Sequence, residues 1–274
     1  MGVDVRSLQG LVVAITGGAR GIGLATARAL TAEGVTVAIG DIDLIDADPG
    51  IAALSVRMDI ADPESFEDFL DQVEDRLGPI DVLINNAAIM PVGRIVEEPH
   101  AVTRRIVEVN LFGLITGTKL ALRRMVRRSS GHVINLASLS GEQNIPGAAT
   151  YCATKHAIIG FTDSVRLEYR GTGVDISLVL PSFVDTDMNR GAKAFAGVRM
   201  TNPEEIAAAI VGLIRKPRAS IRVNWSAGML SASRKFFPRH IGDAISRALG
   251  GETTFLADLN QAERRSYEDR IRAR

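Results

Sequence analysis

Tyr151 and Lys155 stand four residues apart in the segment T-Y-C-A-T-K-H-A (150–157), whose other residues are mostly small or apolar. On a helix, side chains at positions i and i+4 leave the same face about one turn apart. A buried ammonium group beside a phenol costs free energy if it serves structure alone. A cation near a phenol favours the phenolate and lowers its pKa, so the pair is suited to moving a proton to or from an alcohol oxygen. The spacing alone is equally compatible with a pair on a helix surface.

A glycine-rich segment, T-G-G-A-R-G-I-G (16–23), links an apolar run to a segment with helical spacing. Gly17, Gly21 and Gly23 permit a tight turn, close approach of the backbone to a ligand and close packing of helix on strand. The N–H groups that begin the helix can bind a pyrophosphate. Asp41, about 20 residues further on, can accept hydrogen bonds from an adenine ribose. Glycine clusters also form plain turns, and Asp41 could be a solvated turn residue. The order strand, loop, helix nevertheless predicts a dinucleotide site.

Short apolar runs alternate with helical segments along most of the chain. The predicted strands are 11–16, 35–40, 53–58, 81–86, 132–137, 174–180 and 220–225. The predicted helices are 22–34, 63–77, 102–128, 151–169 and 203–215. Strands that are apolar nearly throughout must be covered on both faces. The pattern therefore predicts one α/β domain over residues 1–274, with a doubly wound, seven-stranded parallel sheet between helices. Residues 183–200 and 226–274 fall outside the alternation and are predicted to be a substrate lid and a helical C-terminal appendage.

The composition narrows the classes of function. Apolar residues make up 46% of the 274 residues, and 32 basic residues balance 32 acidic ones. This balance favours neither nucleic acid nor an anionic membrane as a partner. The single cysteine, Cys152, suits a reducing compartment, and the four histidines lack the spacing of a metal site, so we expect no metal. The sequence holds no apolar run typical of a signal peptide or a membrane span, which predicts a cytoplasmic protein.

Six motifs, in order, make residues 8–225 resemble the short-chain dehydrogenase/reductase family. They are T-G-x-x-x-G-x-G at 16–23, the acid at 41, M-D-I at 58–60, N-N-A-A at 85–88, Asn110 in V-E-V-N, and Ser138 with Y-x-x-x-K thirteen residues on. The segment P-S-F-V-D-T (181–186) resembles the one that follows the sixth strand of the family. Ala88 and Ser182 each replace a glycine of the family pattern, but neither position transfers protons. The resemblance implies a Rossmann-type dehydrogenase core with oxidoreductase activity.

The resemblance implies a role for each of four catalytic residues. Tyr151 would be the general acid or base for hydride transfer between an alcohol carbon and nicotinamide. Lys155, helped by the positive ring of oxidised nicotinamide, would lower the pKa of Tyr151 and would also hydrogen-bond the nicotinamide ribose. Ser138 would hold the substrate oxygen, and Asn110 would fix a water that links Lys155 to solvent. Taken singly, Ser138 could be a strand-end turn residue and Asn110 a helix cap.

The resemblance also implies a set of cofactor-binding residues. They are Gly17, Arg20, Gly21, Ile22, Gly23, Asp41, Asp59, Ile60, Asn86, Ala87, Tyr151, Lys155, Pro181, Val184 and Thr186. In this set Asp59 could instead be an acid at a helix N-terminus, and Asn86 could simply cap a strand end. Asp41 favours NAD over NADP, because a 2′-phosphate would remove a donor to its carboxylate and repel it. Arg20 could partly neutralise that phosphate but could not restore the donor.

The residues expected around the substrate are largely apolar. They are Leu139, Ile145, Pro146, Met90, Pro91, Phe183, Met188, Phe195 and Met200. Because no arginine or lysine is among them, we expect a small apolar secondary alcohol or ketone of steroid, terpenoid or lipid type. The alternatives are an inactive nucleotide-binding sensor or scaffold, an NADP-dependent ketone reductase, and an isomerase or dehydratase of the same fold.

Three helical segments carry predictions about surfaces. In the family, the helices at 102–128 and 151–170 pair across a two-fold axis, which predicts a homodimer or homotetramer. The apolar residues expected there are Leu120, Leu122, Met125, Phe161 and Val165. The amphipathic stretch 234–249 is expected to pack on its own protein or a partner subunit, with a membrane surface as the alternative. The tail 262–274 predicts a solvated, ion-paired helix.

Overall fold

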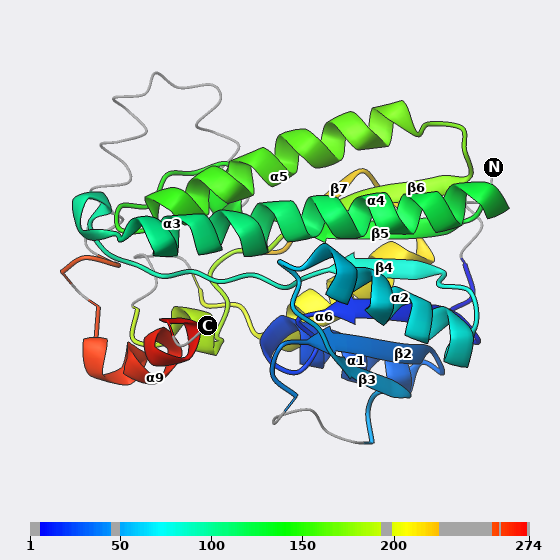
Figure 1. Ribbon diagram of the computed structural model, residues 1–274, viewed down its shortest axis with the longest axis horizontal. Coiled ribbons are helices and arrows are strands. Elements are labelled where there is room, and N and C mark those ends of the chain that lie inside the picture. Colours follow the sequence, from blue (N-terminus) through cyan, green and yellow to red (C-terminus); the bar gives the residue numbers. More distant parts are fainter. Residues whose placement is uncertain (1–5, 45–49, 193–198, 225–253, 258, 273–274) are drawn as a thin grey trace.

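One parallel sheet forms the centre of the molecule (Figure 1). The structure, a computed structural model, describes residues 6–44, 50–192, 199–224, 254–257 and 259–272. Seven strands follow the order β3-β2-β1-β4-β5-β6-β7, and every neighbouring pair is parallel. The strands are β1 (Val12–Thr16), β2 (Thr36–Asp41), β3 (Leu54–Arg57), β4 (Val82–Asn85), β5 (Gly131–Leu136), β6 (Val174–Leu180) and β7 (Ser220–Arg222). The predicted seven-stranded α/β fold is confirmed.

Helices cover both faces of the sheet, as strands buried on both sides require. The main helices are α1 (Gly21–Ala32), α2 (Pro63–Leu77), α3 (His100–Val107), α4 (Gly113–Met125), α5 (Ala149–Glu168), α6 (Pro203–Arg215) and α9 (Gln261–Arg272). α1 and α6 pack against each other and against one face of the sheet, while α2, α4 and α5 cover the other face. Figure 1 shows α4 and α5 running side by side over the sheet.

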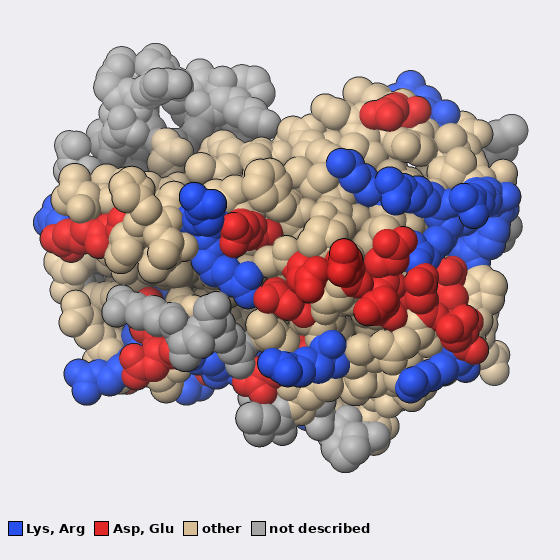
Figure 2. Space-filling model, in the orientation of Figure 1, with Lys and Arg blue, Asp and Glu red and all other residues tan. Residues whose placement is uncertain are grey.

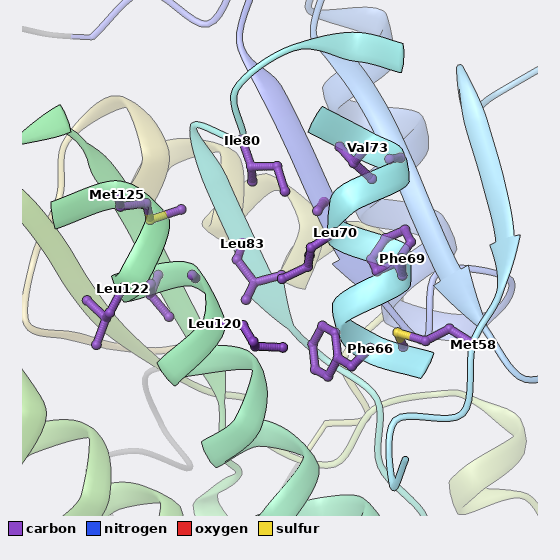
Figure 3. Packing of buried hydrophobic residues seen from close by; sticks show 14 of the residues in the cluster. Met58, Phe66, Phe69, Leu70, Val73, Ile80, Leu83, Leu120, Leu122 and Met125 are labelled. Carbon is purple, nitrogen blue, oxygen red and sulfur yellow. The ribbon is translucent and has the colours of Figure 1, made fainter. Parts of the chain in front are cut away.

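The core on the α2 and α4 face is filled by large apolar side chains (Figure 3). Phe66 and Phe69 of α2 are fully buried, and Met125 of α4 closes the same layer. Burying a side chain of this size stabilises the fold by about 1.5–3 kcal/mol. This layer fixes α4 relative to β4, and therefore fixes the edge of the sheet from which the candidate catalytic groups extend.

The segment predicted as one helix over 102–128 is interrupted. α3 ends at Val107, a π-helical segment η2 (Glu108–Phe112) follows, and α4 then runs into a short 3₁₀ turn, η3 (Val126–Arg128). Gly113 lies directly against Ile60, where a Cβ atom would collide with the isoleucine side chain and carbonyl. Single π-helical turns inside helices are frequent at functional sites, and this one contains Asn110.

The apolar residues expected at a subunit interface lie in the core of the chain instead. Leu120, Leu122, Met125 and Val165 are buried inside the chain, and Phe161 packs partly buried against the same core. The expectation that they form an exposed surface is wrong, because this side of α4 and α5 faces α2 and the sheet. The exposed apolar side chains of this region are Phe112, with 57% of its surface exposed, and Leu167, with 53%.

The charged residues of the same face are gathered over α2 and at the end of α4. Figure 2 shows acidic side chains over α2 beside basic ones over the C-terminal end of α4. Arg124 of α4 forms ion pairs with Asp71 and Glu74 of α2. Much of the visible surface of α5 carries no charge until its C-terminal end (Figure 2).

The C-terminal part of the chain agrees only partly with expectation. α9 forms the predicted helix and carries ion pairs, but Arg264 and Tyr267 on one of its faces are buried. The expectation of a solvated helix is therefore wrong for that face. Residues 234–249 and Phe195 lie outside the described residues. Of the expected lid, the described part contains an isolated bridge between Val184 and Thr201 and the 3₁₀ turn η5 (Asp187–Asn189). No described helix has the length and hydropathy needed to cross a membrane.

Candidate active site

Four polar side chains meet near the carboxyl end of β5. Ser138 follows this strand, Tyr151 and Lys155 belong to α5, and Asn110 belongs to η2. All four are at least nine-tenths buried. Buried polar groups are costly unless they are hydrogen-bonded, so each contact within this group carries information.

Lys155 lies beside the ring of Tyr151, as the spacing of the pair predicts. The Lys155 Nζ atom is 5.5 Å from the centre of the Tyr151 ring and donates a hydrogen bond of 2.9 Å to the carbonyl of Leu136. No carboxylate accepts from Lys155 among the contacts of the described residues. Burial lowers the pKa of the Lys155 ammonium to about 7. This lysine can therefore change its charge near neutral pH.

The pKa of Tyr151 departs from the sequence-based expectation in the chain alone. Burial raises the pKa of this phenol more than a hydrogen bond with Ser138 lowers it. We expected the positive charge of Lys155 to lower the pKa of Tyr151. Burial, however, lowers the pKa of Lys155, so this lysine is only partly protonated at neutral pH. In the chain by itself, Tyr151 is thus a neutral phenol that can donate a proton.

Asn110 connects η2 to the chain segment that follows β4. Its Oδ1 atom accepts from the N–H of Ile89 at 2.8 Å, and its Nδ2 atom donates to the carbonyl of Ile89 at 2.9 Å. A longer contact of 3.4 Å joins Nδ2 to Thr154 on α5. Asn110 therefore joins η2, the segment after β4 and α5, the helix that carries Tyr151, which is more than the helix cap that its sequence allowed.

Ser140 is a neighbour that the sequence interpretation missed. The hydroxyl of Ser138 donates to the hydroxyl of Ser140 at 3.1 Å and accepts from the N–H of Ser140 at 3.1 Å. The S-L-S sequence at 138–140 could have indicated this contact. A serine hydroxyl often accepts from the backbone N–H two residues further on. Together these bonds fix the Ser138 hydroxyl next to Tyr151.

The glycine loop has the close packing expected of a phosphate-binding turn. The N–H of Gly17 donates to Gly40 at 2.8 Å, and the backbone φ angles of Gly17 and Gly21 are +66° and +54°. A Cβ atom on Gly23 would collide with the carbonyl of Gly17. Thr186 lies 3.4 Å from the position that a Cβ on Gly21 would take. Only glycine suits these positions, and α1 begins at Gly21 and continues through Ile22. The loop therefore fits a dinucleotide pyrophosphate.

Asn86 and Ala87 support this loop from the end of β4. The Nδ2 atom of Asn86 donates to the carbonyls of Thr16 at 2.9 Å and Gly17 at 3.0 Å. The N–H groups of Asn86 and Ala87 both donate to the hydroxyl of Thr16, at 3.0 Å and 3.1 Å. These contacts tie β4 to the loop after β1, so Asn86 joins two strands and does not merely cap one.

Asp41 lies at the end of β2 beside the glycine loop. Its carboxylate accepts from the N–H groups of Ala19 at 3.1 Å and Asp43 at 3.2 Å, and it is 8% exposed. Burial raises the pKa of Asp41 despite these hydrogen bonds. Arg20 forms an ion pair of 2.9 Å with Asp43, a residue that the sequence interpretation did not single out. Two carboxylates and a partnered arginine thus surround the expected ribose position.

Asp59 and Ile60 follow β3 at the same edge. Asp59 accepts from the N–H of Ala61 at 2.9 Å and forms an ion pair of 3.1 Å with Arg105 of α3. It is not the N-terminal acid of α2, since Asp62 caps that helix by accepting from Glu64 at 3.0 Å. Ile60 is buried against Gly113.

Pro181, Ser182 and Val184 form the segment after β6. The carbonyl of Pro181 accepts from the N–H of Leu139 at 2.9 Å, which brings this segment beside Ser138. Ser182 stands where the family has glycine, yet its φ angle is not positive, and its hydroxyl contacts that of Thr201 at 2.8 Å. The turn therefore accommodates serine without backbone strain. Val184 is buried and supports the bridge to Thr201.

An apolar cluster adjoins Tyr151, and we name it the Tyr151 cluster. Its buried members are Met90, Ala148, Tyr151, Cys152, Phe183 and Phe255, with Val92, Ile145, Met188, Ala192, Met200 and Leu259 partly buried against them. The rings of Phe183 and Phe255 are 6.0 Å apart. Five of the residues expected around the substrate belong to this cluster: Met90, Ile145, Phe183, Met188 and Met200.

Three other residues expected around the substrate, Pro91, Pro146 and Leu139, lie outside the Tyr151 cluster. Pro91 and Pro146 are partly buried next to Met90 and Ile145 in the chain. Leu139 is instead buried with Leu178 and Leu180 in a separate cluster between α5 and β6. This placement is a correction, and its cause is the backbone bond from Leu139 to Pro181, which turns residue 139 toward the sheet.

The expected absence of a cation near the substrate region is also corrected. Arg264 of α9 is 1% exposed and donates to the carbonyl of Met188 at 2.7 Å and to the carbonyl of Met90. Its charge is paired with Glu268, one helical turn along, at 2.8 Å. Among the described residues, no three histidine, cysteine, aspartate or glutamate side chains are grouped as metal ligands.

Comparison with known proteins gives the family. A family model described as short chain dehydrogenase matches residues 11–196. Meso-2,3-butanediol dehydrogenase of Serratia marcescens is 36% identical over 74% of this chain and 86% of its own length. A 3-oxoacyl-[acyl-carrier-protein] reductase of Vibrio harveyi is 32% identical over 78% of this chain and 94% of its own length. The crystal structure of levodione reductase covers 82% of this chain and 99% of its own, with 26% identity and a TM-score of 0.71. The chain therefore belongs to the short-chain dehydrogenase family of nucleotide-dependent oxidoreductases.

Proposed function

We propose that this protein transfers a hydride between NAD and a secondary alcohol or ketone, with Tyr151 as general acid and base. The observation that carries the proposal is the buried group formed by Ser138, Tyr151 and Lys155. Tyr151 contacts the hydroxyl of Ser138 and has the Lys155 ammonium 5.5 Å from its ring centre. A purely structural arrangement would not bury an ammonium group without a carboxylate partner.

Each residue of the group has a proposed task. The Ser138 hydroxyl, fixed by Ser140, holds the substrate oxygen next to the Tyr151 hydroxyl. In reduction, Tyr151 donates its proton to that oxygen, which suits a phenol whose pKa is raised by burial. In oxidation, the positive charges of Lys155 and of the bound nicotinamide ring favour the phenolate. The cofactor, when bound, supplies the hydride acceptor or donor. Asn110 holds the chain beside this group and, in our proposal, fixes a water that returns protons to Lys155.

We propose NAD as the cofactor, with NADP used far less. Asp41 offers a carboxylate beside the glycine loop, and a ribose hydroxyl can donate to it. Asp43 adds a second negative charge and pairs with Arg20, the residue that could otherwise approach a 2′-phosphate. Hydrogen bonds to a charged group contribute about 1.5–3 kcal/mol, which a phosphate at that position would forfeit. In the proposal the remaining cofactor contacts are made by Asp59, Ile60, Asn86, Ala87 and the segment 181–186.

The proposed substrate is an alcohol or ketone with a compact apolar body. The Tyr151 cluster supplies methionine and phenylalanine side chains, which fit rings and short alkyl chains by shape and not by charge. A steroid, terpenoid or lipid-like body is compatible with this surface. Relatives named cis-4-hydroxycyclohexanecarboxylate dehydrogenase and meso-2,3-butanediol dehydrogenase, 34% and 36% identical, support an alcohol on a small carbon frame.

An inactive nucleotide-binding sensor of the same fold is the second candidate. The intact set of Asn110, Ser138, Tyr151 and Lys155 favours the enzyme, since Tyr151 contacts both Ser138 and Lys155. Asn110 is held close by, on Ile89 and Thr154. The test is a screen of hydroxysteroids, terpene alcohols and 3-hydroxyacyl thioesters with NAD, followed by the absorbance of reduced nicotinamide. Turnover that disappears in Tyr151→Phe supports the enzyme. Tight NAD binding without turnover of any of these compounds supports the sensor.

We further propose a single-domain chain that assembles in the cytoplasm as a homodimer or homotetramer through α4 and α5. Phe112 and Leu167 are the exposed apolar residues that such an interface would cover. Light scattering is expected to give a mass of two or four times the 29.4 kDa of the chain. A 29.4 kDa species at micromolar concentration would refute the assembly.

A further inference from the structure

One face of α9 is buried although the helix is strongly polar. Arg264 and Tyr267, three residues apart, are 1% and 5% exposed, whereas Arg265 beside them is exposed. The Arg264 guanidinium carbon lies 4.9 Å from the centre of the Tyr267 ring. Its nitrogens donate to Met90, Met188 and Glu268. Arg264 therefore positions the Tyr267 ring against the segment after β4.

The hydroxyl of Tyr267 has one hydrogen bond and the capacity for another. Its oxygen accepts from the N–H of Met90 at 2.8 Å. None of the hydrogen bonds between described residues has the Tyr267 hydroxyl as its donor. A buried donor that finds no acceptor is costly, and nearly all buried polar groups are satisfied by protein, water or ligand.

The position of this hydroxyl relates it to the substrate. Met90, whose N–H it accepts, has its side chain in the Tyr151 cluster. The charge of Tyr267 also contributes to raising the pKa of Tyr151, so the two phenols are within electrostatic reach. Burial raises the pKa of Tyr267 to about 12, and the hydroxyl therefore keeps its proton at neutral pH.

We propose that Tyr267 donates a hydrogen bond to a second, uncharged oxygen of the substrate, so that the protein prefers diols, hydroxy ketones or diketones over simple alcohols. Tyr151 acts at one oxygen and Tyr267 binds the other, while the Tyr151 cluster encloses the carbon frame between them. The inference rests on the proposed function and narrows its substrate class. Arg264 is a positioning residue in this arrangement, since each of its three nitrogens already donates to Met90, Met188 or Glu268.

The test compares oxidation by NAD of cyclohexanol with that of the 1,2-, 1,3- and 1,4-cyclohexanediols, for wild type, Tyr267→Phe and Tyr169→Phe. Tyr169 is the matched control, because it ends α5 and packs on the core on the α2 side. The wild type is expected to prefer at least one diol about tenfold in kcat/KM, which corresponds to about 1.4 kcal/mol. In Tyr267→Phe this preference disappears because the diol alone is turned over more slowly. Tyr169→Phe keeps the preference.

Three results would overturn the inference in distinguishable ways. A wild type that turns over cyclohexanol and every diol equally well removes the second-oxygen site and leaves the oxidoreductase intact. Tyr267→Phe that slows cyclohexanol and the diols by the same factor shows that Tyr267 only supports the fold. No turnover of any compound by the wild type contradicts the proposed function on small alcohols, and the inference with it.

Discussion

In the described part of the chain, Arg264 and Lys155 are both buried near the Tyr151 cluster, and their surroundings differ. Arg264 of α9 is 1% exposed and has Glu268 and two backbone carbonyls as acceptors. Lys155 of α5 is 3% exposed and has one carbonyl, that of Leu136. Burial lowers the pKa of Lys155 to about 7 because no carboxylate compensates its charge.

Under the proposed function, this difference separates a cation that stabilises structure, Arg264, from one that takes part in proton transfer, Lys155. A buried charge with a full set of partners destabilises the fold little. Removing it by substitution destabilises the fold strongly, because its partners are left uncompensated. A buried charge without a counter-ion destabilises the fold and persists only where function requires it. The comparison therefore predicts opposite effects when each cation is removed.

The largest effect is expected for Lys155→Met. Turnover should fall by about 10²- to 10⁴-fold, the usual contribution of proton-transfer groups. Stability without cofactor should rise, because the folded-state pKa of Lys155, about 7, lies below its ordinary value of 10.5. Between these two values the unfolded chain binds a proton that the folded chain does not. Lys155 therefore makes the wild type less stable as the pH falls from 10.5 to 7. The free energy of unfolding decreases by about 1.4 kcal/mol per pH unit in this range.

Urea unfolding at pH 7 and pH 9 measures this effect, with Lys119→Met of α4, an exposed lysine, as control. The advantage of Lys155→Met over wild type should shrink by about 2–3 kcal/mol between pH 7 and pH 9. Lys119→Met should show no such change. A Lys155→Met protein that is less stable than wild type at pH 7 would show that the ammonium is compensated after all.

A change in stability of opposite sign, a loss, is expected for Arg264→Met. The substitution removes the donor to the carbonyls of Met90 and Met188, at about 1–3 kcal/mol for each unsatisfied group, and removes the ion pair with Glu268. Hydrogen exchange should report loss of protection in α9 and around Met90, with little change in the sheet. Arg265→Met, at the neighbouring exposed position, should leave protection unchanged. Equal protection in both variants would mean that α9 is held by apolar contacts alone.

A third buried charge, the Asp41 carboxylate beside the glycine loop, extends the comparison to the proposed cofactor site. Asp41 is buried like the two cations, and its carboxylate accepts from two backbone N–H groups. We propose that it also accepts from a ribose hydroxyl of the cofactor. We expect wild type to prefer NAD over NADP by about two decades in kcat/KM, or about 2.7 kcal/mol. Asp41→Ala should narrow this ratio at least tenfold, and Asp43→Ala less, since it only releases Arg20. Steady-state kinetics with both cofactors decide the matter. Equal use of NADP by wild type would refute the assignment.

The fold was predictable wherever local chemistry and global packing agree. The predicted bounds of α2 and α6 match the structure, because in both an N-cap residue precedes a proline. Asp62 accepts from Glu64 before Pro63, and the side chain of Glu205 accepts from the N–H of Asn202 before Pro203. The interruption at η2 was not predictable, because the apolar periodicity continues through it. Its cause is tertiary, in the contact of Gly113 with Ile60 and of Asn110 with Ile89.

The part of the candidate site that is made of the family motifs was predictable from the sequence. The part that α9 contributes was not. The glycine loop, Asp41 and the Tyr151–Lys155 pair occupy fixed intervals, and the structure brings them to one edge of the sheet. The burial of Arg264 and Tyr267 cannot be read from sequence spacing, because α9 is mostly charged and has no regular apolar stripe. Its partners, Met90 and Met188, are far away in the chain. Likewise, which side of α4 and α5 is exposed depends on α2, and not on their own periodicity.

The most direct test of the central claim is the rate of hydride transfer in Tyr151→Phe, measured in a single turnover with NAD and a substrate from the screen. A deuterated carbinol carbon shows whether chemistry limits the rate. We predict a fall of about 10²- to 10⁴-fold with NAD affinity changed by no more than a small factor. A variant that keeps more than about a tenth of the wild-type rate, with a full isotope effect in both proteins, would contradict the assignment of Tyr151 as the proton-transferring group.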